Sequence, residues 1–525
     1  MSKRKSSISI LSSILLSTAL ALPAAASGRQ ATVQRSSLTH YVMFDVGSFG
    51  GHFTSICGLA CRPLNEKGAL VGINATAADD PFDPNCFYDC HLDHAFEWKN
   101  GGTNDIGALQ YGLSSFALGI SNRGLAVGLS ENGQFDPDTG IWEGRAVAWS
   151  KNGKIKDLGT LGGTQSVAGP GVNSSGQVAV QTSTSDSNDP FIGVSQANCI
   201  WLPTTERDCK DLDFATNAIF LPVTTTMHGA VWSANAGLQD AGTLSGPDSV
   251  VYDINNSSQA VGWSYTSYQA GASGVPETHP FLWDNGTAVD LGTFGGTFGE
   301  ATLINNNGKV TGTANTAGDI EVRPFIWDKA NGLVDLGSLG GDYGHGDWIN
   351  DRDEVVGFSR TTPGSIAGHA FYWHGGVLTE ISPVGDDPES EANTINNNGI
   401  IAGVDFYRDE NGSGVDMRGW VSDNGGAPID LNTLIRKPHG LYVTAAVQIN
   451  DRGVIAANAI TRKGESRTVV LVPENDFDIL AQMNNSAHAA PNEDDSGPVS
   501  VPSRNLLKRN CVGERRIHPA ACRRG

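Results

Sequence analysis

The sequence is short of basic residues and, beyond residue 22, has no long apolar run. Its 35 Lys and Arg residues face 56 Asp and Glu residues, which gives a net charge of −21. A body this acidic repels phosphate backbones, so we expect no nucleic-acid partner. Because no later stretch is apolar enough to span a bilayer, we expect no transmembrane segment either.

Familiar catalytic motifs are missing as well. The chain has no Ser nucleophile elbow, no glycine-rich phosphate-binding loop and no His-Glu-x-x-His helix. Helical periodicity is absent from 45 to 471, where short apolar runs alternate with turn residues. This pattern indicates an all-β fold, and any chemistry has to come from residues that the fold brings together.

A unit of about fifty residues recurs through this region, and such self-similarity indicates an array of identical supersecondary units. The clearest copy has Asp-Leu-Gly-Thr-Phe-Gly-Gly at 290–296, Ile-Asn-Asn-Asn-Gly at 304–308 and Arg-Pro-Phe-Ile-Trp at 323–327. Asn and Gly suit the turn because both tolerate φ > 0, and the Asn side chain can bond nearby backbone. The Asn-x-x-Gly turn starts at Asn65, Asn173, Asn305, Asn396 and Asn450, with Ser121 in the Asn place of the second copy.

Each unit contains four short strands, which is the size of a propeller blade. The first Asp-Leu-Gly-type strand, around Met43, precedes every other element, whereas the last element is the strand around Val470. Pairing of these two strands would close the ring and protect its edges. The sequence therefore predicts an all-β propeller over 41–475, with eight four-stranded blades and the N-terminal strand completing the last blade. Seven blades, with one degenerate unit, are the alternative.

Together, Asp-Leu-Gly-Thr-Leu-Gly-Gly at 157–163, the Ile-Asn-x-x-Gly turns and His-Ala-Phe-x-Trp at 94–98 resemble the bacterial extracellular HAF-repeat proteins. The likeness covers almost all of 45–471. It departs where Arg replaces the His of the triplet, at Arg145, Arg323, Arg418 and Arg467. The resemblance implies secretion and a repeat fold, and it carries over no activity.

The ends of the chain predict export. Lys3, Arg4 and Lys5 precede an apolar run that ends in Ala-Ala-Ala at 24–26, which is typical of a secretory signal peptide over 1–26. An N-terminal extension over 27–40 follows. No Cys follows the cleavage site directly, so we expect a secreted monomer, extracellular or periplasmic, rather than a lipoprotein.

Eight cysteines in an exported chain favour disulfides. Two Cys-x-x-x-Cys pairs in the first blade could instead form a zinc site, so both interpretations stay open there. The cysteines form local sets: Cys57, Cys61, Cys86 and Cys90, then Cys199 with Cys209, then Cys511 with Cys522.

The C-terminal region departs from the repeat. Residues 476–503 are rich in Asn, Ala, Ser, Pro and acids, which predicts a disordered acidic linker. Residues 504–525 form a basic tail around the last Cys pair. The tail is interpreted either as solvated or as binding an anionic surface.

The propeller topology places nearly all long insertions on one face, because the loops between second and third strands and between successive blades share it. These insertions are 74–93, 129–144, 181–227 and 404–417. Variable loops on a rigid scaffold are where binding usually occurs. Trp142 and Trp201 lie in such insertions, where an exposed indole could stack on a sugar ring. The alternative is that they only pack the loops.

Three consecutive units break the pattern on the innermost strand. Five residues before the turn, where other units have small or apolar residues, they place Glu300, His345 and Glu391. Asp347 and Tyr343 lie close by on the sixth unit, and Tyr343 is a candidate ligand-binding residue. We expect this cluster at the mouth of the central channel, where it could bind a divalent cation or act as a general acid and base. The alternative is that these residues have no binding or catalytic role and are hydrated side chains around a water-filled channel.

A second candidate site lies in the last long insertion. Asp409, Asn411, Ser413 and Asp416 place oxygen ligands at alternating positions, as calcium loops do, which makes Ca²⁺ the candidate cofactor. The Glu expected seven residues later in an EF-hand is missing, so the match is incomplete.

Two functions follow from these residues. The first is a non-catalytic propeller that binds an extracellular polysaccharide or protein on its insertion face. The second is a polysaccharide lyase or glycosidase that uses Glu300, His345, Asp347 and Glu391. Arg62, on the first unit, is expected to lie too far across the ring to assist a lyase. A scaffold whose basic tail does the binding is a third possibility.

Overall fold

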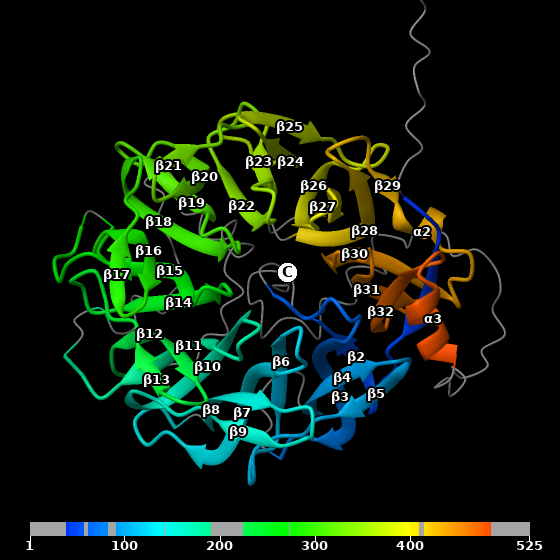
Figure 1. Ribbon diagram of the computed structural model, residues 1–525, viewed down its shortest axis with the longest axis horizontal. Coiled ribbons are helices and arrows are strands. Elements are labelled where there is room, and N and C mark those ends of the chain that lie inside the picture. Colours follow the sequence, from blue (N-terminus) through cyan, green and yellow to red (C-terminus); the bar gives the residue numbers. More distant parts are fainter. Residues whose placement is uncertain are drawn as a thin grey trace, which may run out of the picture. The chain divides into compact units, whose positions relative to one another are not determined.

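The computed structural model describes residues 38–56, 61–81, 91–140, 142–188, 191, 224–271, 273–408 and 414–484. Within them, strands form six separate four-stranded sheets and one eight-stranded sheet. The larger sheet is two four-stranded units joined by a single parallel bridge between Thr278 and Phe298. The described residues thus contain eight blades arranged in a ring (Figure 1), which confirms the propeller and excludes seven blades.

Each blade is a meander of antiparallel strands that runs outwards from the centre of the ring, and in the eighth blade β1 is added as the outermost strand (Figure 1). The innermost strands are β2 (Gly50–Ser55), β6 (Ser115–Ile120), β10 (Gly162–Val172), β14 (Ser249–Ile254), β18 (Gly295–Ile304), β22 (Gly344–Ile349), β26 (Glu389–Ile395) and β30 (Leu441–Ile449). The second strands are β3 (Leu70–Asp79), β7 (Ala126–Phe135), β11 (Val178–Thr184), β15 (Gln259–Tyr265), β19 (Val310–Thr316), β23 (Val355–Arg360), β27 (Ile400–Arg408) and β31 (Ile455–Thr461).

The two outer layers carry the aromatic and Asp-Leu-Gly motifs. The third strands are β4 (His91–Lys99), β8 (Trp142–Trp149), β12 (Met227–Ser233), β16 (Thr278–Asp284), β20 (Val322–Asp328), β24 (Gly368–His374), β28 (Gly414–Asp423) and β32 (Ser466–Pro473). The outermost strands are β5 (Gly102–Asp105), β9 (Ile155–Asp157), β13 (Gly237–Asp240), β17 (Thr287–Asp290), β21 (Gly332–Asp335), β25 (Val377–Ile381), β29 (Ile429–Asp430) and β1 (Tyr41–Asp45).

The chain closes the ring as the sequence predicts. β1 pairs antiparallel with β32, with Met43 opposite Leu471, so the N-terminal strand completes the eighth blade. The hydrophobic core lies between neighbouring blades. One cluster, for example, joins Val71 and Ala95 of the first blade to Val147 and Trp149 of the second.

The Asn of each repeat turn links its blade to the next one. Its Oδ1 accepts backbone N–H groups of its own turn, as Asn65 does from Lys67 and Ala69, both at 3.0 Å. Its Nδ2 donates to the backbone carbonyl of the following turn. We call these bonds the amide belt. They run from Asn65 to Ser121, from Asn173 to Asn255, from Asn255 to Asn305, from Asn305 to Asn350, from Asn350 to Asn396, from Asn396 to Asn450, and from Asn450 back to Asn65.

Among the described turns, the amide belt is interrupted after Ser121. Its hydroxyl accepts the Leu125 N–H at 3.0 Å and so replaces the local role of Asn. The Gly place of the turn has a positive φ throughout, including 64° at both Ser258 and Asp353, where the repeat lacks Gly. The turn Asn residues are not among the residues with positive φ, so their role is hydrogen bonding alone.

The His of the repeated triplet pairs with the acid of the neighbouring outermost strand. In each pair the His Nδ1 lies 2.6–2.9 Å from a carboxylate oxygen, which explains why the two motifs recur together. The pairs are His94 with Asp105, His228 with Asp240, His279 with Asp290 and His369 with Glu380. These histidines therefore tie the third strand to the outermost strand of their blades.

Two short helices lie outside the strand pattern. α2 (Leu431–Leu434) is one turn capped by the Asp430 side chain. α3 (Phe477–Asn484) falls in the segment predicted to be a disordered linker, and that prediction is wrong for these residues. They fold because Ile479 packs into the core of the eighth and first blades, and because Asp476 accepts the Ile479 N–H at 3.2 Å. The rest of the linker, the basic tail and the signal peptide lie outside the described residues.

Candidate functional site

Three neighbouring innermost strands place the polar residues that break the repeat. Glu300 lies on β18, His345 and Asp347 on β22, and Glu391 on β26. Each of Glu300, His345 and Glu391 lies opposite the equivalent residue of the second strand, since the blades share one register. The structure thus brings these residues together at the same height in adjacent blades, as the sequence predicts.

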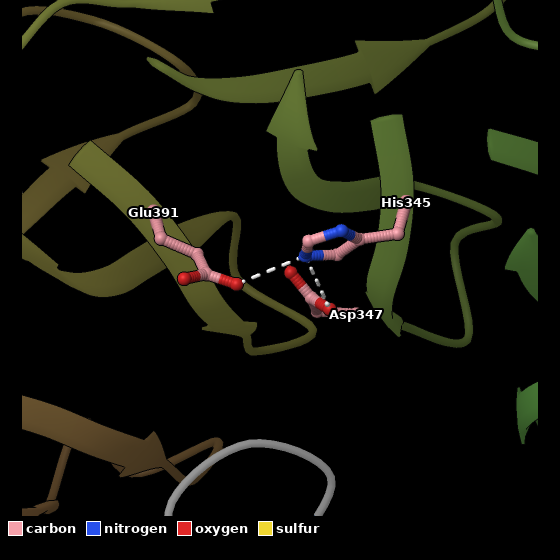
Figure 2. A group of neighbouring side chains, drawn as sticks. All are labelled: His345, Asp347 and Glu391. Carbon is pink, nitrogen blue, oxygen red and sulfur yellow. Dashed lines mark hydrogen bonds and ion pairs between the residues drawn. The ribbon is translucent and has the colours of Figure 1, made fainter. Parts of the chain in front are cut away.

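The closest group is His345 with two carboxylates, shown in Figure 2. His345 Nε2 lies 3.0 Å from Glu391 Oε1 and 3.4 Å from Asp347 Oδ1. One ligand-type atom from each residue lies within 4.8 Å of the other two. We call these three residues the His-Asp-Glu cluster.

The cluster is buried rather than hydrated. His345, Asp347 and Glu391 are 3–5% exposed, and Glu300 is 1% exposed. The expectation of side chains at an open channel mouth is therefore wrong. A polysaccharide chain has no access to groups this deeply buried, whereas a proton or a single ion needs only to occupy the space between them.

Burial controls the electrostatics of this group. Loss of hydration raises the pKa of Glu300 to about 7, although His345 and the Tyr252 hydroxyl favour its charged form. Burial likewise raises the pKa of Asp347 to about 7. Burial alone would lower the pKa of His345, but the adjacent Asp347 carboxylate and the hydrogen bond to Glu391 raise it well above its usual value.

Aromatic side chains fix the imidazole. The Phe358 ring stacks on His345 with centroids 5.5 Å apart, and Tyr343 meets it edge-on at 5.6 Å. Tyr343 is itself 3% exposed, and Arg360 lies 4.9 Å over its ring. Tyr343 therefore packs inside the protein and is not placed to contact a ligand, contrary to the expectation.

Several polar atoms of this region have no hydrogen-bond partner although they are buried. They include Asp347 Oδ2, His345 Nδ1, Glu300 Oε1 and the Oδ1 of Asn393 on β26. Buried polar atoms are nearly always satisfied in native proteins, so four such atoms in adjacent blades require an explanation.

Arg62 crosses the ring, contrary to expectation. Its guanidinium donates to Asp253 of β14 at 2.7 Å and lies 5.4 Å from the ring centroid of Trp348 on β22. Asp253 also accepts the backbone N–H of Ile304 at 3.0 Å. Arg62 therefore joins the first, fourth and sixth blades, and the repeat pattern could not reveal a contact between residues on opposite sides of the ring.

The insertion face exposes apolar side chains in its described loops. Tyr111 is 79% exposed between β5 and β6, and Phe135 is 47% exposed at the end of β7. Exposed apolar residues also occupy the loops between the second and third strands of the fourth to sixth blades, at Tyr268, Ile320 and Ile366. Tyr111 has a φ of 72°, a backbone conformation that is unfavourable for a bulky residue.

Of the other predicted site residues, the structure describes Trp142 and Cys61. Trp142 is half-buried and packs against the cluster of Phe53 and Phe116, which favours loop packing over sugar stacking. Cys61 is buried. Trp201, the remaining cysteines and the proposed calcium ligands at Asp409, Asn411 and Ser413 lie outside the described residues, as does the side chain of Asp416.

Within the described residues, no helix combines the length and the apolar character needed to cross a membrane. No family model matches the sequence, and no curated protein does so.

Several solved structures are similar to this chain at very low sequence identity. The propeller domain of the Trilobed protease from Pyrococcus furiosus is 8% identical, with a TM-score of 0.37 over 68% of this chain and 93% of that one. The acylaminoacyl peptidase of Pyrococcus horikoshii is 10% identical, with a TM-score of 0.34 over 79% and 58% of the two chains. An ulvan lyase is 10% identical, with a TM-score of 0.23 over 80% and 81%. None of these similarities assigns a function to this chain.

Proposed function

We propose that the protein is an exported propeller that binds an extracellular carbohydrate or protein through its insertion face. The observation that supports this most strongly is Tyr111, an aromatic residue that is 79% exposed and has a positive φ. Strained backbone persists where function requires it, and an exposed aromatic ring can stack on a sugar or enter a pocket of a partner protein.

The neighbouring structure supports the same face. Tyr111 lies against β7, since a Cβ on Gly133 would come within 2.3 Å of the Tyr111 carbonyl oxygen. The Glu131 carboxylate fixes the loop after Tyr111 by accepting the N–H groups of Leu113 and Ser114, at 3.2 and 2.9 Å. The ring is therefore presented on a supported loop, which lowers the entropy cost of binding.

A polysaccharide-cleaving enzyme is the second candidate, and the site favours it less. Its proposed acids and base are at most 5% exposed, so a polymer could reach them only after the innermost strands separate. Arg62, the basic group near the centre of the ring, is already committed to Asp253.

The test compares two exposed aromatic residues on opposite faces. Tyr111→Ala removes the ring on the insertion face, whereas Phe477→Ala removes a ring that is 76% exposed on α3, beside the Asn turns. Both purified variants are applied to a glycan array, and a photo-crosslinking residue at position 111 captures protein partners from culture fluid. We expect binding that Tyr111→Ala abolishes and Phe477→Ala retains.

Other outcomes separate the two functions. Release of reducing ends or of unsaturated products by the parent protein would establish the enzyme instead. A ligand that Tyr111→Ala still binds at full strength would refute the insertion face as the binding surface.

A further inference from the structure

The His-Asp-Glu cluster has the geometry of a metal site. Three protein ligands bound to one tetrahedral zinc ion at about 2.0–2.2 Å place their donor atoms roughly 3.3–3.6 Å apart. His345 Nε2 lies 3.4 Å from Asp347 Oδ1 and 3.0 Å from Glu391 Oε1, and one ligand-type atom of each residue lies within 4.8 Å of the other two. Figure 2 shows that both carboxylates turn towards the same nitrogen.

Carboxyl groups outnumber cationic side chains in this region. Three carboxyl groups, of Glu300, Asp347 and Glu391, surround one imidazole, and all four side chains are at most 5% exposed. Uncompensated buried charge costs several kcal/mol for each ion. The nearby guanidinium groups are engaged elsewhere, since Arg62 pairs with Asp253 and Arg360 with Asp342.

Two buried acceptor atoms, one in the cluster and one beside it, lack a hydrogen-bond partner. Asp347 Oδ2 belongs to a cluster residue and has no hydrogen-bond partner. Glu300 Oε1 is also without a partner, and its carboxyl group interacts electrostatically with His345. A bound cation and the water that it carries would satisfy such acceptors.

We propose that His345, Asp347 and Glu391 bind one divalent transition-metal ion, of the zinc or manganese type, inside the ring. One imidazole nitrogen and two carboxylate oxygens suit these ions better than they suit Ca²⁺ or Mg²⁺, which take oxygen ligands. The ion would join β22 to β26 and leave a fourth position for water. The site is separate from the ligand surface proposed above.

The experiment uses the full mature chain, purified in chelator and then dialysed. Zn²⁺, Mn²⁺, Ca²⁺ and Mg²⁺ are titrated singly, with calorimetry for stoichiometry and thermal unfolding as a second readout. We expect one equivalent of Zn²⁺ or Mn²⁺ to bind and to raise the midpoint of unfolding. His345→Gln and Glu391→Gln should each weaken this binding at least tenfold.

The matched control is His369→Gln, which removes a His–carboxylate pair with Glu380 on the outer strands of the same blade as His345. It should bind metal as the parent does. Retained binding in His345→Gln would overturn the proposal and direct attention to the cysteines. Equal loss in His369→Gln, stoichiometric binding of Ca²⁺ alone, or no binding at all would also overturn it.

A spectroscopic measurement keeps the test independent of stability. Co²⁺ bound by nitrogen and oxygen ligands gives visible absorption that depends on its ligands. We expect this spectrum in the parent and its loss or displacement in His345→Gln. If Glu391→Gln does not fold, Asp347→Asn takes its place in both measurements.

Discussion

Asn450 Nδ2 donates a hydrogen bond of 2.9 Å to the backbone carbonyl of Asn65, 385 residues away in the sequence. Beside it, the Asp451 N–H donates to Glu66 Oε2 at 3.0 Å. The same two contacts join most consecutive blades, as between Asn396 and Asn450. The last blade is thus joined to the first by the same two hydrogen bonds that join most other neighbouring blades.

Asn450→Ala should lower the free energy of unfolding by about 1–3 kcal/mol. The change removes the bond to Asn65 and leaves the N–H groups of Arg452 and Val454 without their acceptor. Urea unfolding measures the loss. Asn331→Ala, at an exposed Asn that bonds only to Asp328, is the control and should change stability by less than about 0.5 kcal/mol. Equal losses of stability in the two variants would show that the hydrogen bonds of the amide belt do not stabilise the fold.

Ser121→Asn should complete the amide belt. The new Nδ2 would reach the carbonyl of Asn173, as its equivalents do in the other turns, and we expect a gain of about 0.5–1.5 kcal/mol in the free energy of unfolding. Thermal unfolding of the variant checks this. A loss of stability would mean that the second and third blades are spaced differently from the rest.

Arg62→Met should destabilise the protein by about 2–4 kcal/mol, because it leaves the 2%-exposed Asp253 carboxylate without its cation. The double variant Arg62→Met with Asp253→Asn should recover most of this loss. Chemical unfolding of the two single variants and the double variant gives the coupling energy. If the double variant is no more stable than Arg62→Met alone, the ion pair is not the cause.

Asp405 should make stability depend on pH. Burial, and then the neighbouring Asp387, raise its pKa to about 8. The folded state therefore keeps a proton that the unfolded chain loses near pH 4, so the stabilisation is present below about pH 4 and is lost as pH rises to about 8. Asp405→Asn should exceed the parent in stability increasingly over this range, by on the order of 1–3 kcal/mol at its upper end. A difference that does not change with pH would contradict this.

Tyr111→Gly should raise stability while it lowers ligand binding. Gly adopts a φ of 72° without strain, which should raise the free energy of unfolding by about 1 kcal/mol. The greater conformational entropy of the unfolded Gly variant offsets part of this gain. Tyr111→Ala, which keeps the strain, is the comparison. Thermal unfolding of both variants tests it, and a less stable Gly variant would refute backbone strain at this loop.

The sequence predicts the closed ring because the number and order of the repeated strands are enough to establish it. Each blade repeats the same motifs, and the extra strand at the start matches the missing strand at the end, so β1 beside β32 follows from order alone. The role of Asn65 in the amide belt does not follow, since a repeat specifies what each blade contains and not which atoms meet between blades.

The candidate site is predicted in position but not in environment. Glu300, His345 and Glu391 are recognisable because they depart from small or apolar residues at the same position, and the shared register of the blades fixes their height. Their burial depends on how side chains of all the blades fill the centre, which no single repeat contains. Secretion, membership of the HAF-repeat family, the cysteine pairing and calcium binding stay predictions.

The contacts of Arg62 limit the width of the ring. One side chain from the first blade reaches Asp253 on the fourth and Trp348 on the sixth, so the opposite walls cannot lie farther apart than an extended arginine allows. An extra inserted blade would widen the centre and break both contacts at once. The insertion of a blade would therefore cost the protein the cation that compensates the buried Asp253 carboxylate.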